Sequence, residues 1–310
     1  MIKSSKAFSP AGISSFFEIC DRELDGRPIV DFEKVGARGG GFVLVKGVLT
    51  EVSITEATQN SIRVFINGIS FPEADTTKTV ANNLLGMVDR EYIVTIRHSV
   101  EFPIGAGFGS SAAGSLGTAF ALSDALGLHI TYNQLGRIAH VAEVKCRTGL
   151  GTVGPLLLGG CIITIEPGAP GYSVIDRIPI TAEHWIVAGV FKPWPTKEVL
   201  ASQEKLKKVN YWGRKTVENI LAEPSLKNFM RGSKEFAVKT GLATERVKKL
   251  IASAEEAGAI GAAQNMVGEA VHALTTSENL EGVLQVFHKV LPREKVLSSK
   301  VDLQGVRLLR

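Results

Sequence analysis

The strongest constraint on this chain is one run of small residues over 103–114, which reads PIGAGFGSSAAG. It follows a strand-like stretch over 92–96 and leads into an apolar helix predicted over 116–126. Glycine has no Cβ, so the backbone of such a loop can approach a ligand closely. The free N–H groups at the start of the next helix attract anions. A glycine-rich turn that only packs a helix on a sheet is the alternative, but the hydroxyls of Ser110 and Ser111 at the helix start favour a phosphate site.

Size and composition exclude several classes of protein. The chain has 310 residues, 45% hydrophobic and 21% charged, which predicts a globular protein of one large or two ordinary domains. The net charge of +4 includes no Lys/Arg block, so we expect no nucleic-acid partner. No stretch approaches the roughly 20 apolar residues of a membrane span, so we expect no membrane partner. Cys20, Cys146 and Cys161 have neither disulfide nor metal spacing, and we expect a reducing, cytoplasmic setting.

The first ninety residues predict antiparallel strands with one helix. Strands are expected over 42–54 and 61–66, the second followed by an Asn67-Gly68 hairpin turn, and a helix over 77–87. Two further segments are predicted to be loops. We expect residues 7–19 to form a loop that either borders a site or packs its two phenylalanines into the core. The glycine-rich segment 36–41 is expected to be a flexible loop.

The helix predicted after Thr131 carries candidate chemistry. Thr131 and Gln134 have the spacing of a capping box. His140 and Glu143 stand three residues apart and therefore share a helix face. A nucleotide-bound Mg²⁺ needs a carboxylate or hydroxyl near the β- and γ-phosphates, and Glu143 and Ser111 could supply one each.

A solvated role for Glu143 is the alternative, with the carboxylate paired to Lys145 or Arg147. A second glycine-rich segment over 147–155 follows at once, which favours the functional interpretation.

The second half of the chain changes in composition. Strands are predicted over 161–165, 172–180 and 185–191, and helices over 197–206, 211–221, 226–240, 245–257, 267–274 and 280–290. We therefore predict two domains, 1–185 and 186–310. A third glycine-bearing patch over 257–268 lies between two predicted helices and could close over the site.

Residues 103–113 resemble the phosphate-binding motif of the GHMP kinases, with Phe108 where leucine is usual. Residues 9–13 and 258–268 are similar to the first and third motifs of that superfamily. The resemblance implies an α+β fold of two domains, a ribosomal protein S5-like N-terminal domain and a ferredoxin-like C-terminal domain, with the site between them. It implies ATP and Mg²⁺ as cofactors. The implied nucleotide-binding residues are Pro103, Gly105, Ala106, Gly107, Gly109, Ser110, Ser111 and Ala112.

Within the superfamily, the chain resembles the archaeal pantoate kinases at its N-terminus and over 36–41, 139–143 and 148–151. This resemblance implies that Ser111 and Glu143 hold Mg²⁺ and that His140 touches the acceptor. The predicted catalytic residues are Ser111, Glu143 and Thr152. The predicted acceptor-binding residues are Ser14, Ser15, Arg38, His140 and Arg147, and Lys145 and Lys192 are further candidate cations.

The chain departs from the pantoate kinase pattern at four positions. Thr152 stands where the family has an Asp, the implied general base. Ala37 replaces a Ser and Thr164 an Arg, both implied to bind pantoate. Gly12 replaces a His in the first motif. The nucleotide half of the pattern is intact, whereas the acceptor half is altered.

A kinase remains the predicted function without that Asp. Phosphoryl transfer relies mostly on positioning and charge stabilisation, and a general base contributes about 10²–10⁴-fold. We expect the acceptor to be a small hydroxy acid with a primary alcohol. The altered positions favour mevalonate 3-phosphate, phosphorylated on its 5-hydroxyl in an archaeal isoprenoid pathway, slightly over pantoate, the precursor of coenzyme A. A non-catalytic protein that binds ATP is the alternative of another class. A homodimer is compatible with the sequence, which carries no signal for oligomeric state.

Overall fold

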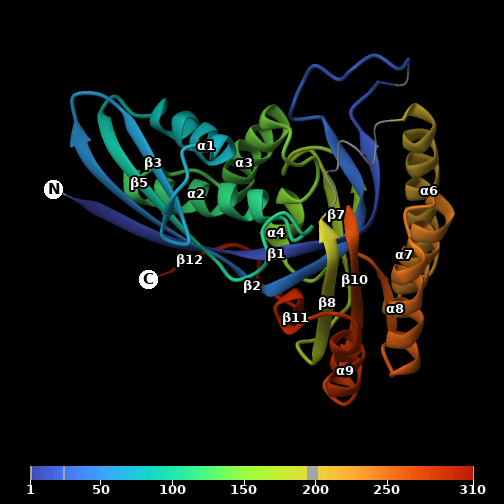
Figure 1. Cartoon of the computed structure of the whole chain (residues 1–310). Helices are drawn as coiled ribbons and strands as arrows, with labels where there is room; N and C mark the ends of the chain where they lie inside the picture. The colour runs from blue at the N-terminus through green and yellow to red at the C-terminus, as the bar shows by residue number, and fades with distance from the viewer. Residues whose placement is uncertain (1, 24, 194–201, 310) are drawn as a thin grey trace.

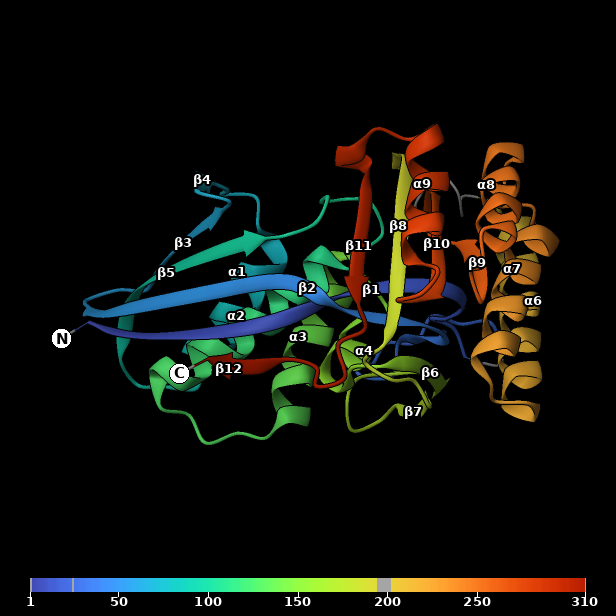
Figure 2. The ribbon, with the colours of Figure 1, turned by 90° about the horizontal axis from the view of Figure 1, so that it is seen from below.

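The computed structural model of the protein describes residues 2–23, 25–193 and 202–309, which form two β-sheets with helices around them (Figures 1 and 2). The larger sheet has the strand order β12-β1-β2-β5-β3-β4, with β6 and β7 added beside β2. Its strands are β1 (Lys3–Cys20), β2 (Gly36–Ala57), β3 (Ser61–Ile66), β4 (Ile69–Ser70), β5 (Glu91–Val100), β6 (Cys161–Glu166), β7 (Val174–Ile178) and β12 (Arg307–Leu309). The smaller sheet has the order β11-β8-β10-β9 and consists of β8 (His184–Pro193), β9 (Gly261–Gln264), β10 (Gly268–Thr276) and β11 (Val296–Lys300).

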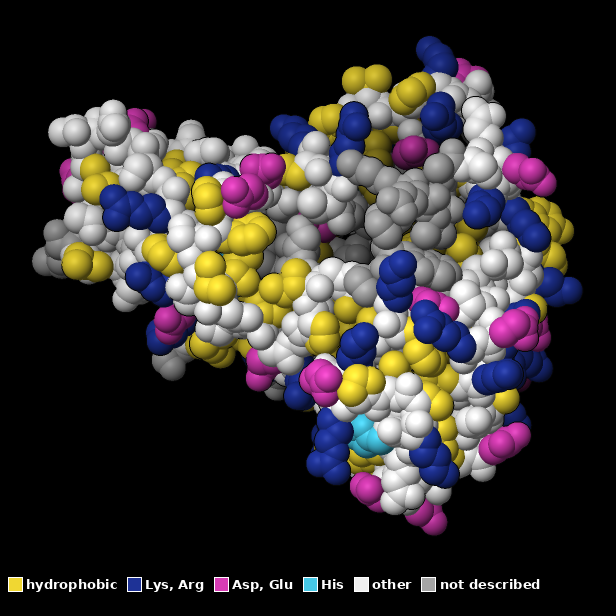
Figure 3. Space-filling view, viewed as in Figure 1, with side chains coloured by type: hydrophobic (Ala, Val, Ile, Leu, Met, Phe, Trp, Pro, Cys, Tyr) yellow, Lys and Arg dark blue, Asp and Glu magenta, His cyan; other side chains and the backbone are white. Residues whose placement is uncertain are grey.

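The helices divide between the two sheets. One face of the larger sheet is covered by α1 (Asp75–Leu85), α2 (Ser110–Leu126), α3 (Tyr132–Cys146) and α4 (Val153–Leu158). On the smaller sheet pack α7 (Leu226–Thr240), α8 (Glu245–Glu256) and α9 (Leu280–Val290), while α6 (Gln203–Ala222) packs on α7 and on β1. A 3₁₀ turn, Arg293–Lys295, precedes β11. Basic side chains gather over the side of the molecule formed by these C-terminal helices and are interspersed with acidic ones (Figure 3).

Strands β1 and β2 extend through the whole molecule and join its two halves (Figure 2). Phe16 of β1 packs edge-on against Phe229 and Phe236 of α7, and Phe42 of β2 against His272 of β10. The expectation that residues 7–19 and 36–41 form loops is therefore wrong. The glycines of 36–41 mark close strand contact, because a Cβ on Gly41 would collide with the carbonyl of Ile13.

Several predicted elements are confirmed. Helices α7 and α9 begin and end where the sequence predicted them, and Thr131 caps α3 in a capping box with Gln134. The predicted helix over 267–274 is instead strand β10, which is buried along nearly its whole length between β8 and β9. The predicted helices over 197–206 and 211–221 merge into the single helix α6, and residues 197–201 lie outside the described part of the chain.

The α+β class agrees with the prediction, and the two sheets occupy different parts of the molecule. The smaller sheet begins at His184, near the predicted boundary. The final strand, β12, pairs antiparallel with β1, so the end of the chain returns to the larger sheet. None of the described helices is long and apolar enough to span a membrane.

Candidate active site

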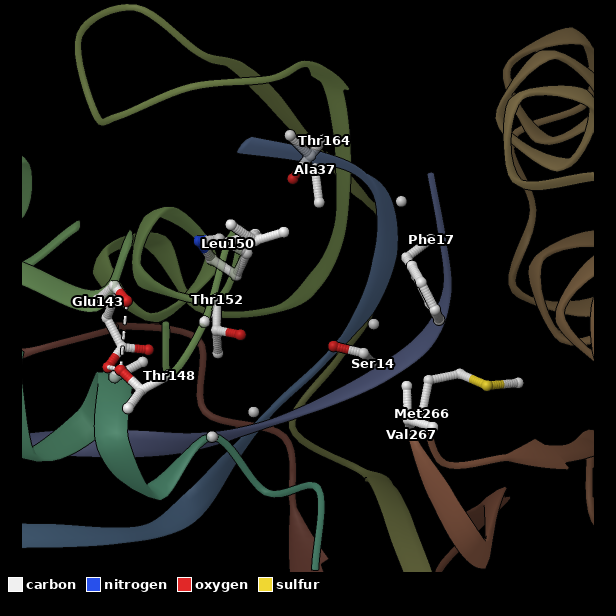
Figure 4. A pocket seen from close by; sticks show the side chains of 18 of the residues that line it. Ser14, Phe17, Ala37, Glu143, Thr148, Leu150, Thr152, Thr164, Met266 and Val267 are labelled. Atoms are coloured by element: carbon white, nitrogen blue, oxygen red, sulfur yellow. Dashed lines mark hydrogen bonds between the residues drawn. The ribbon is translucent and has the colours of Figure 1, made fainter. Parts of the chain in front are cut away.

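A cavity of about 940 Å³ lies where the two sheets meet, a volume typical of small-molecule sites. Its walls include the glycine-rich loop before α2, the bent middle of β1 and β2 with part of the segment that connects them, the loop over 147–152, β6 and the Met266-Val267 turn between β9 and β10. Figure 4 shows side chains from these segments pointing into one space. The cavity therefore joins residues from opposite ends of the sequence, from Gly12 to Val267.

The glycine-rich loop has the backbone of an anion site. Gly105, Gly107 and Gly109 have φ angles of 76°, 80° and 68°, a region that favours glycine. Gly109 begins the 17-residue helix α2, and no side chain caps that helix. The N–H groups of its first turn therefore remain free for an anion. The amide of Gly12 donates to the carbonyl of Phe108 at 3.1 Å, which holds the loop against β1.

Most of the predicted nucleotide-binding residues line this cavity: Gly105, Gly107, Gly109, Ser110, Ser111 and Ala112. Ala106 is buried, and its carbonyl accepts a hydrogen bond from Asn265 Nδ2 at 3.3 Å. Asn265 belongs to the glycine-bearing patch 257–268. This patch and β1 therefore both hydrogen-bond to the glycine-rich loop. Pro103 lies outside the described lining and can act only through the shape of the loop.

Glu143 of α3 is a buried carboxylate at the edge of this loop, only 3% exposed. Its Oε1 accepts hydrogen bonds from Ser111 Oγ and, at 2.7 Å, from Thr148 Oγ1 (Figure 4). Burial raises the pKa of Glu143, and the two hydroxyl hydrogen bonds partly oppose that rise. Gly149 leaves room for the carboxylate, because a Cβ there would collide with Oε2.

The surroundings of Glu143 fit a bound cation. Among the described residues no Lys, Arg or His lies within salt-bridge distance of it, so the alternative pairing with Lys145 or Arg147 is not present. A buried carboxylate without a counter-charge is costly unless a cation accompanies it. The described part of the chain has no cluster of three acidic, His or Cys side chains. A carboxylate and a hydroxyl beside a phosphate loop suit Mg²⁺, which keeps waters and substrate phosphates as its other ligands.

The four positions that depart from the pantoate kinase pattern all line the cavity: Gly12, Ala37, Thr152 and Thr164. Thr152 lies where β1 meets the glycine-rich loop. A Cβ on Gly109 would come within 2.8 Å of the Thr152 methyl, and a Cβ on Gly12 within 3.5 Å. The side chain at 152 therefore packs against both the loop and β1, and a change there alters the wall beside the phosphate site.

Of the predicted acceptor residues, Ser14 faces the cavity. Its hydroxyl and that of Thr152 point toward one another across the space (Figure 4). Ser15 does not reach the cavity: it is fully buried, and its Oγ lies 2.9 Å from His272 Nε2. The reason is a β-bulge between Ser14 and Phe16, which turns the Ser15 side chain toward β10.

His140 does not reach the cavity either. It is 1% exposed, and its Nε2 is 2.8 Å from the carbonyl of Val35. Burial lowers its pKa, so the neutral ring donates this hydrogen bond and holds the segment before β2. The shared helix face predicted for His140 and Glu143 does not bring both to one site.

The two arginines predicted to bind the acceptor differ in whether a carboxylate already pairs with them. Arg38 lines the cavity but is held at 3.4 Å from the buried Glu18 and 3.3 Å from Glu166. Arg147 also lines the cavity, and within the described residues no carboxylate pairs with it. It ends α3 with a φ of 57°, which directs the chain back toward the phosphate loop. Lys145 and Lys192 lie outside the described lining.

Some lining residues carried no recognised signal in the sequence. Phe17, Met266 and Val267 form an apolar wall opposite Glu143 (Figure 4). Thr148 was seen only as part of a family segment, yet its hydroxyl bonds directly to Glu143. A hydroxyl one turn beyond a candidate carboxylate, at the start of a glycine-rich segment, is a signal that could have identified it.

Comparison with known proteins identifies the same regions. Residues 76–160, which contain the glycine-rich loop and Glu143, match the family model described as GHMP kinases N terminal domain. The pantoate kinase of Thermococcus kodakarensis is 34% identical over 91% of each chain. The pantoate kinase of Methanocaldococcus jannaschii is 29% identical over 90% of this chain and 96% of its own.

A solved structure described as a phosphotransferase related to the CoA biosynthesis pathway superimposes on the whole fold. Its TM-score is 0.87 at 30% identity, covering 99% of both chains. Similarity at this level extends beyond the nucleotide motif to the C-terminal sheet and its helices. This chain belongs to the GHMP kinase family and is an ATP-dependent kinase that acts on a hydroxyl group.

Proposed function

We propose that this protein is a pantoate kinase, which transfers the γ-phosphoryl group of ATP to the primary hydroxyl of pantoate. One observation carries the proposal: the phosphate loop, the Ser111–Glu143 pair and the facing hydroxyls of Ser14 and Thr152 line a single cavity. Donor and acceptor can therefore meet in one space. The pantoate kinases that match over nine tenths of this chain support the choice of acceptor.

In this proposal, several residues that line the cavity have a role in the transfer of the phosphoryl group. Free N–H groups of the α2 N-terminus bind the phosphates of ATP, and Ser111 and Glu143 hold Mg²⁺. The metal supplies neutralisation of the charge on the β- and γ-phosphates. Arg147 stabilises charge on the transferring group or on the acceptor carboxylate. The acceptor oxygen bonds to the γ-phosphorus as the bond to the bridging oxygen of ADP breaks.

The proton of the acceptor hydroxyl needs no strong base. The carboxylates along the described lining are those of Asp21 and Glu143, and Glu143 is occupied by two hydroxyls. Thr152 can accept a hydrogen bond from the acceptor and orient it, although it cannot hold a proton near neutral pH. Because the transition state for phosphoryl transfer is loose, the proton can leave late, to the transferred phosphate or to water.

The preference for mevalonate 3-phosphate that the sequence suggested is less well supported than pantoate, because the relatives that match most of the chain are pantoate kinases. One observation still favours a changed acceptor: all four altered positions face the cavity. Both acceptors therefore belong in the test.

The test measures ADP release at saturating Mg²⁺ and ATP with pantoate, mevalonate and the mevalonate phosphates as acceptors. We expect pantoate to give the highest kcat/KM. The Glu143→Gln variant, assayed in parallel, controls for contaminating kinases. Release that depends on mevalonate 3-phosphate instead would assign the other acceptor. ATP binding without acceptor-dependent ADP would indicate the non-catalytic alternative.

A further inference from the structure

Glu143 and three hydroxyl side chains form a closed hydrogen-bonded set that contains more hydroxyls than a metal site requires. Besides Ser111 and Thr148, it includes Thr76 at the start of α1. Thr76 Oγ1 lies 3.0 Å from Thr148 Oγ1 and 3.4 Å from Ser111 Oγ. Thr76 is only 6% exposed and does not line the cavity. It therefore supports the site from behind and cannot itself touch a substrate bound there.

Counting protons in this set shows which bonds can change. Each hydroxyl has one proton to donate. Ser111 and Thr148 both donate to Oε1 of Glu143, so Thr76 must donate to Thr148. Thr76 then keeps lone pairs free toward Ser111. Ser111 thus has two acceptors within reach, the carboxylate and Thr76 Oγ1, but only one proton.

Oε1 of Glu143 already accepts two hydrogen bonds, from Ser111 and Thr148, whereas Oε2 lies against Gly149. A cation held by Oε1 and Ser111 Oγ would need a lone pair of Oε1 that the Ser111 proton now occupies, so this proton would turn to another acceptor. Among the described residues, Thr76 Oγ1, at 3.4 Å, is the other acceptor within hydrogen-bond distance of that hydroxyl. If Thr76 lacked an oxygen, the redirected proton would be buried without a partner, which is unfavourable.

We infer that Thr76 is a positioning residue, which accepts the Ser111 hydroxyl proton when Ser111 and Glu143 hold Mg²⁺. This inference rests on the proposed metal-binding role of those two residues. It assigns a function to the N-terminus of α1, a segment that neither the sequence motifs nor the cavity lining includes. It also explains why the set contains a third hydroxyl that touches neither the carboxylate nor the cavity.

Replacement of Thr76 by Val tests the inference, because Val keeps the shape and removes the oxygen. Mn²⁺ serves as the probe, and its affinity for the enzyme–ADP complex is measured by electron paramagnetic resonance of free Mn²⁺. We expect Thr76→Val to weaken this affinity about five-fold, the effect of losing one hydrogen bond. The KM for the acceptor should not change, and Thr76→Ser should restore Mn²⁺ affinity.

Thr77→Val is the matched control, since Thr77 is the next residue of α1, is also buried, and bonds to His98 instead of the carboxylate set. It should leave Mn²⁺ affinity unchanged. Equal affinities of the wild type and Thr76→Val would overturn the inference. In that event, weaker binding by Glu143→Gln would leave the proposed metal site intact. If Glu143→Gln also binds Mn²⁺ like the wild type, the metal assignment and the inference both fall.

Discussion

At the scale of single residues, Glu143 is the most informative side chain of this protein. A carboxylate that is 3% exposed, with no basic partner among the described residues, destabilises the ligand-free fold. Its pKa is raised in the folded state, mainly by burial, so the folded protein holds the Glu143 proton more tightly than the unfolded chain does. Stability at this site is therefore greatest at low pH and decreases as the pH rises through the folded pKa. In the proposed function, bound Mg²⁺ would offset this cost.

Glu143→Gln should consequently separate stability from activity. The amide keeps an oxygen that accepts from Ser111 and Thr148 but removes the buried charge. We expect turnover to fall roughly 100-fold or more, because metal charge stabilisation is worth several kcal/mol. The Tm without metal or nucleotide should be unchanged or higher at pH 7. Steady-state kinetics and a thermal melt check both, and near-normal turnover would refute the role of Glu143.

The threonine at position 152 cannot act as a base near neutral pH, and this determines the pH dependence that we expect for kcat. No His or Cys lines the cavity among the described residues, and the buried His98 and His272 have pKa values lowered by desolvation to about 4 and about 3. Without a base that titrates near neutrality, kcat should be flat from about pH 6.5 to 9. It should fall on the acid side as Glu143, whose pKa is raised, becomes protonated. An increase of log kcat with pH, with a slope of one between pH 6.5 and 9, would show that a general base exists.

At the scale of elements, the proposed function makes nucleotide affinity depend on the loop-to-helix junction at Gly109. Gly109 has a φ of 68°, and a Cβ there would approach the Thr152 methyl to 2.8 Å. Gly109→Ala should raise the KM for ATP about ten-fold and destabilise the fold by about 1–3 kcal/mol. Titration of ATP at saturating acceptor measures the first effect, and urea unfolding the second.

Gly127 provides the control for that variant at the other end of α2. Its φ is 73°, and a Cβ there meets nothing within 4 Å. Gly127→Ala carries the same kind of backbone strain far from the cavity, so stability should fall while the KM for ATP stays constant. Equal effects of both variants on KM would mean that the junction acts only through global stability.

Elements also differ in how far the sequence predicts them. Helices α7 and α9 have an apolar stripe on one side and were predicted with their correct ends. Strand β10 has eight buried residues in succession, so neither a helical nor an alternating period is visible, and it was mistaken for a helix. The glycine-rich part of β2 resembles a loop because glycine there allows close contact with β1, which only the tertiary structure shows.

The candidate site could be predicted where it depends on local sequence. The phosphate loop follows from a short motif, and Glu143 follows from the glycine-rich segment that comes directly after it. Ser14 and Ser15 could not be distinguished, because a β-bulge decides which of them faces the cavity. Thr76 was not found, because it reaches Ser111 only through the packing of α1 beside α2.

At the scale of the whole molecule, the acceptor pocket is shared between distant parts of the chain. The altered positions belong to β1, β2, the loop before α4 and β6, and the opposite wall comes from the turn before β10. Because β1 and β2 pass through both halves, the fold holds these walls in fixed relation. In the proposed function, acceptor choice is therefore a property of the assembled cavity, whereas ATP binding depends on one loop and one carboxylate.

The most direct test of the central claim is ³¹P NMR of the protein with Mg²⁺, ATP and pantoate in one sample. The account predicts that ATP resonances are replaced by those of ADP and of a phosphomonoester coupled to a CH₂ group. In the same experiment with the Glu143→Gln variant, the resonances of ATP should persist. ATP that persists with the wild type, or that yields only inorganic phosphate, would contradict the assignment of this cavity to phosphoryl transfer onto pantoate.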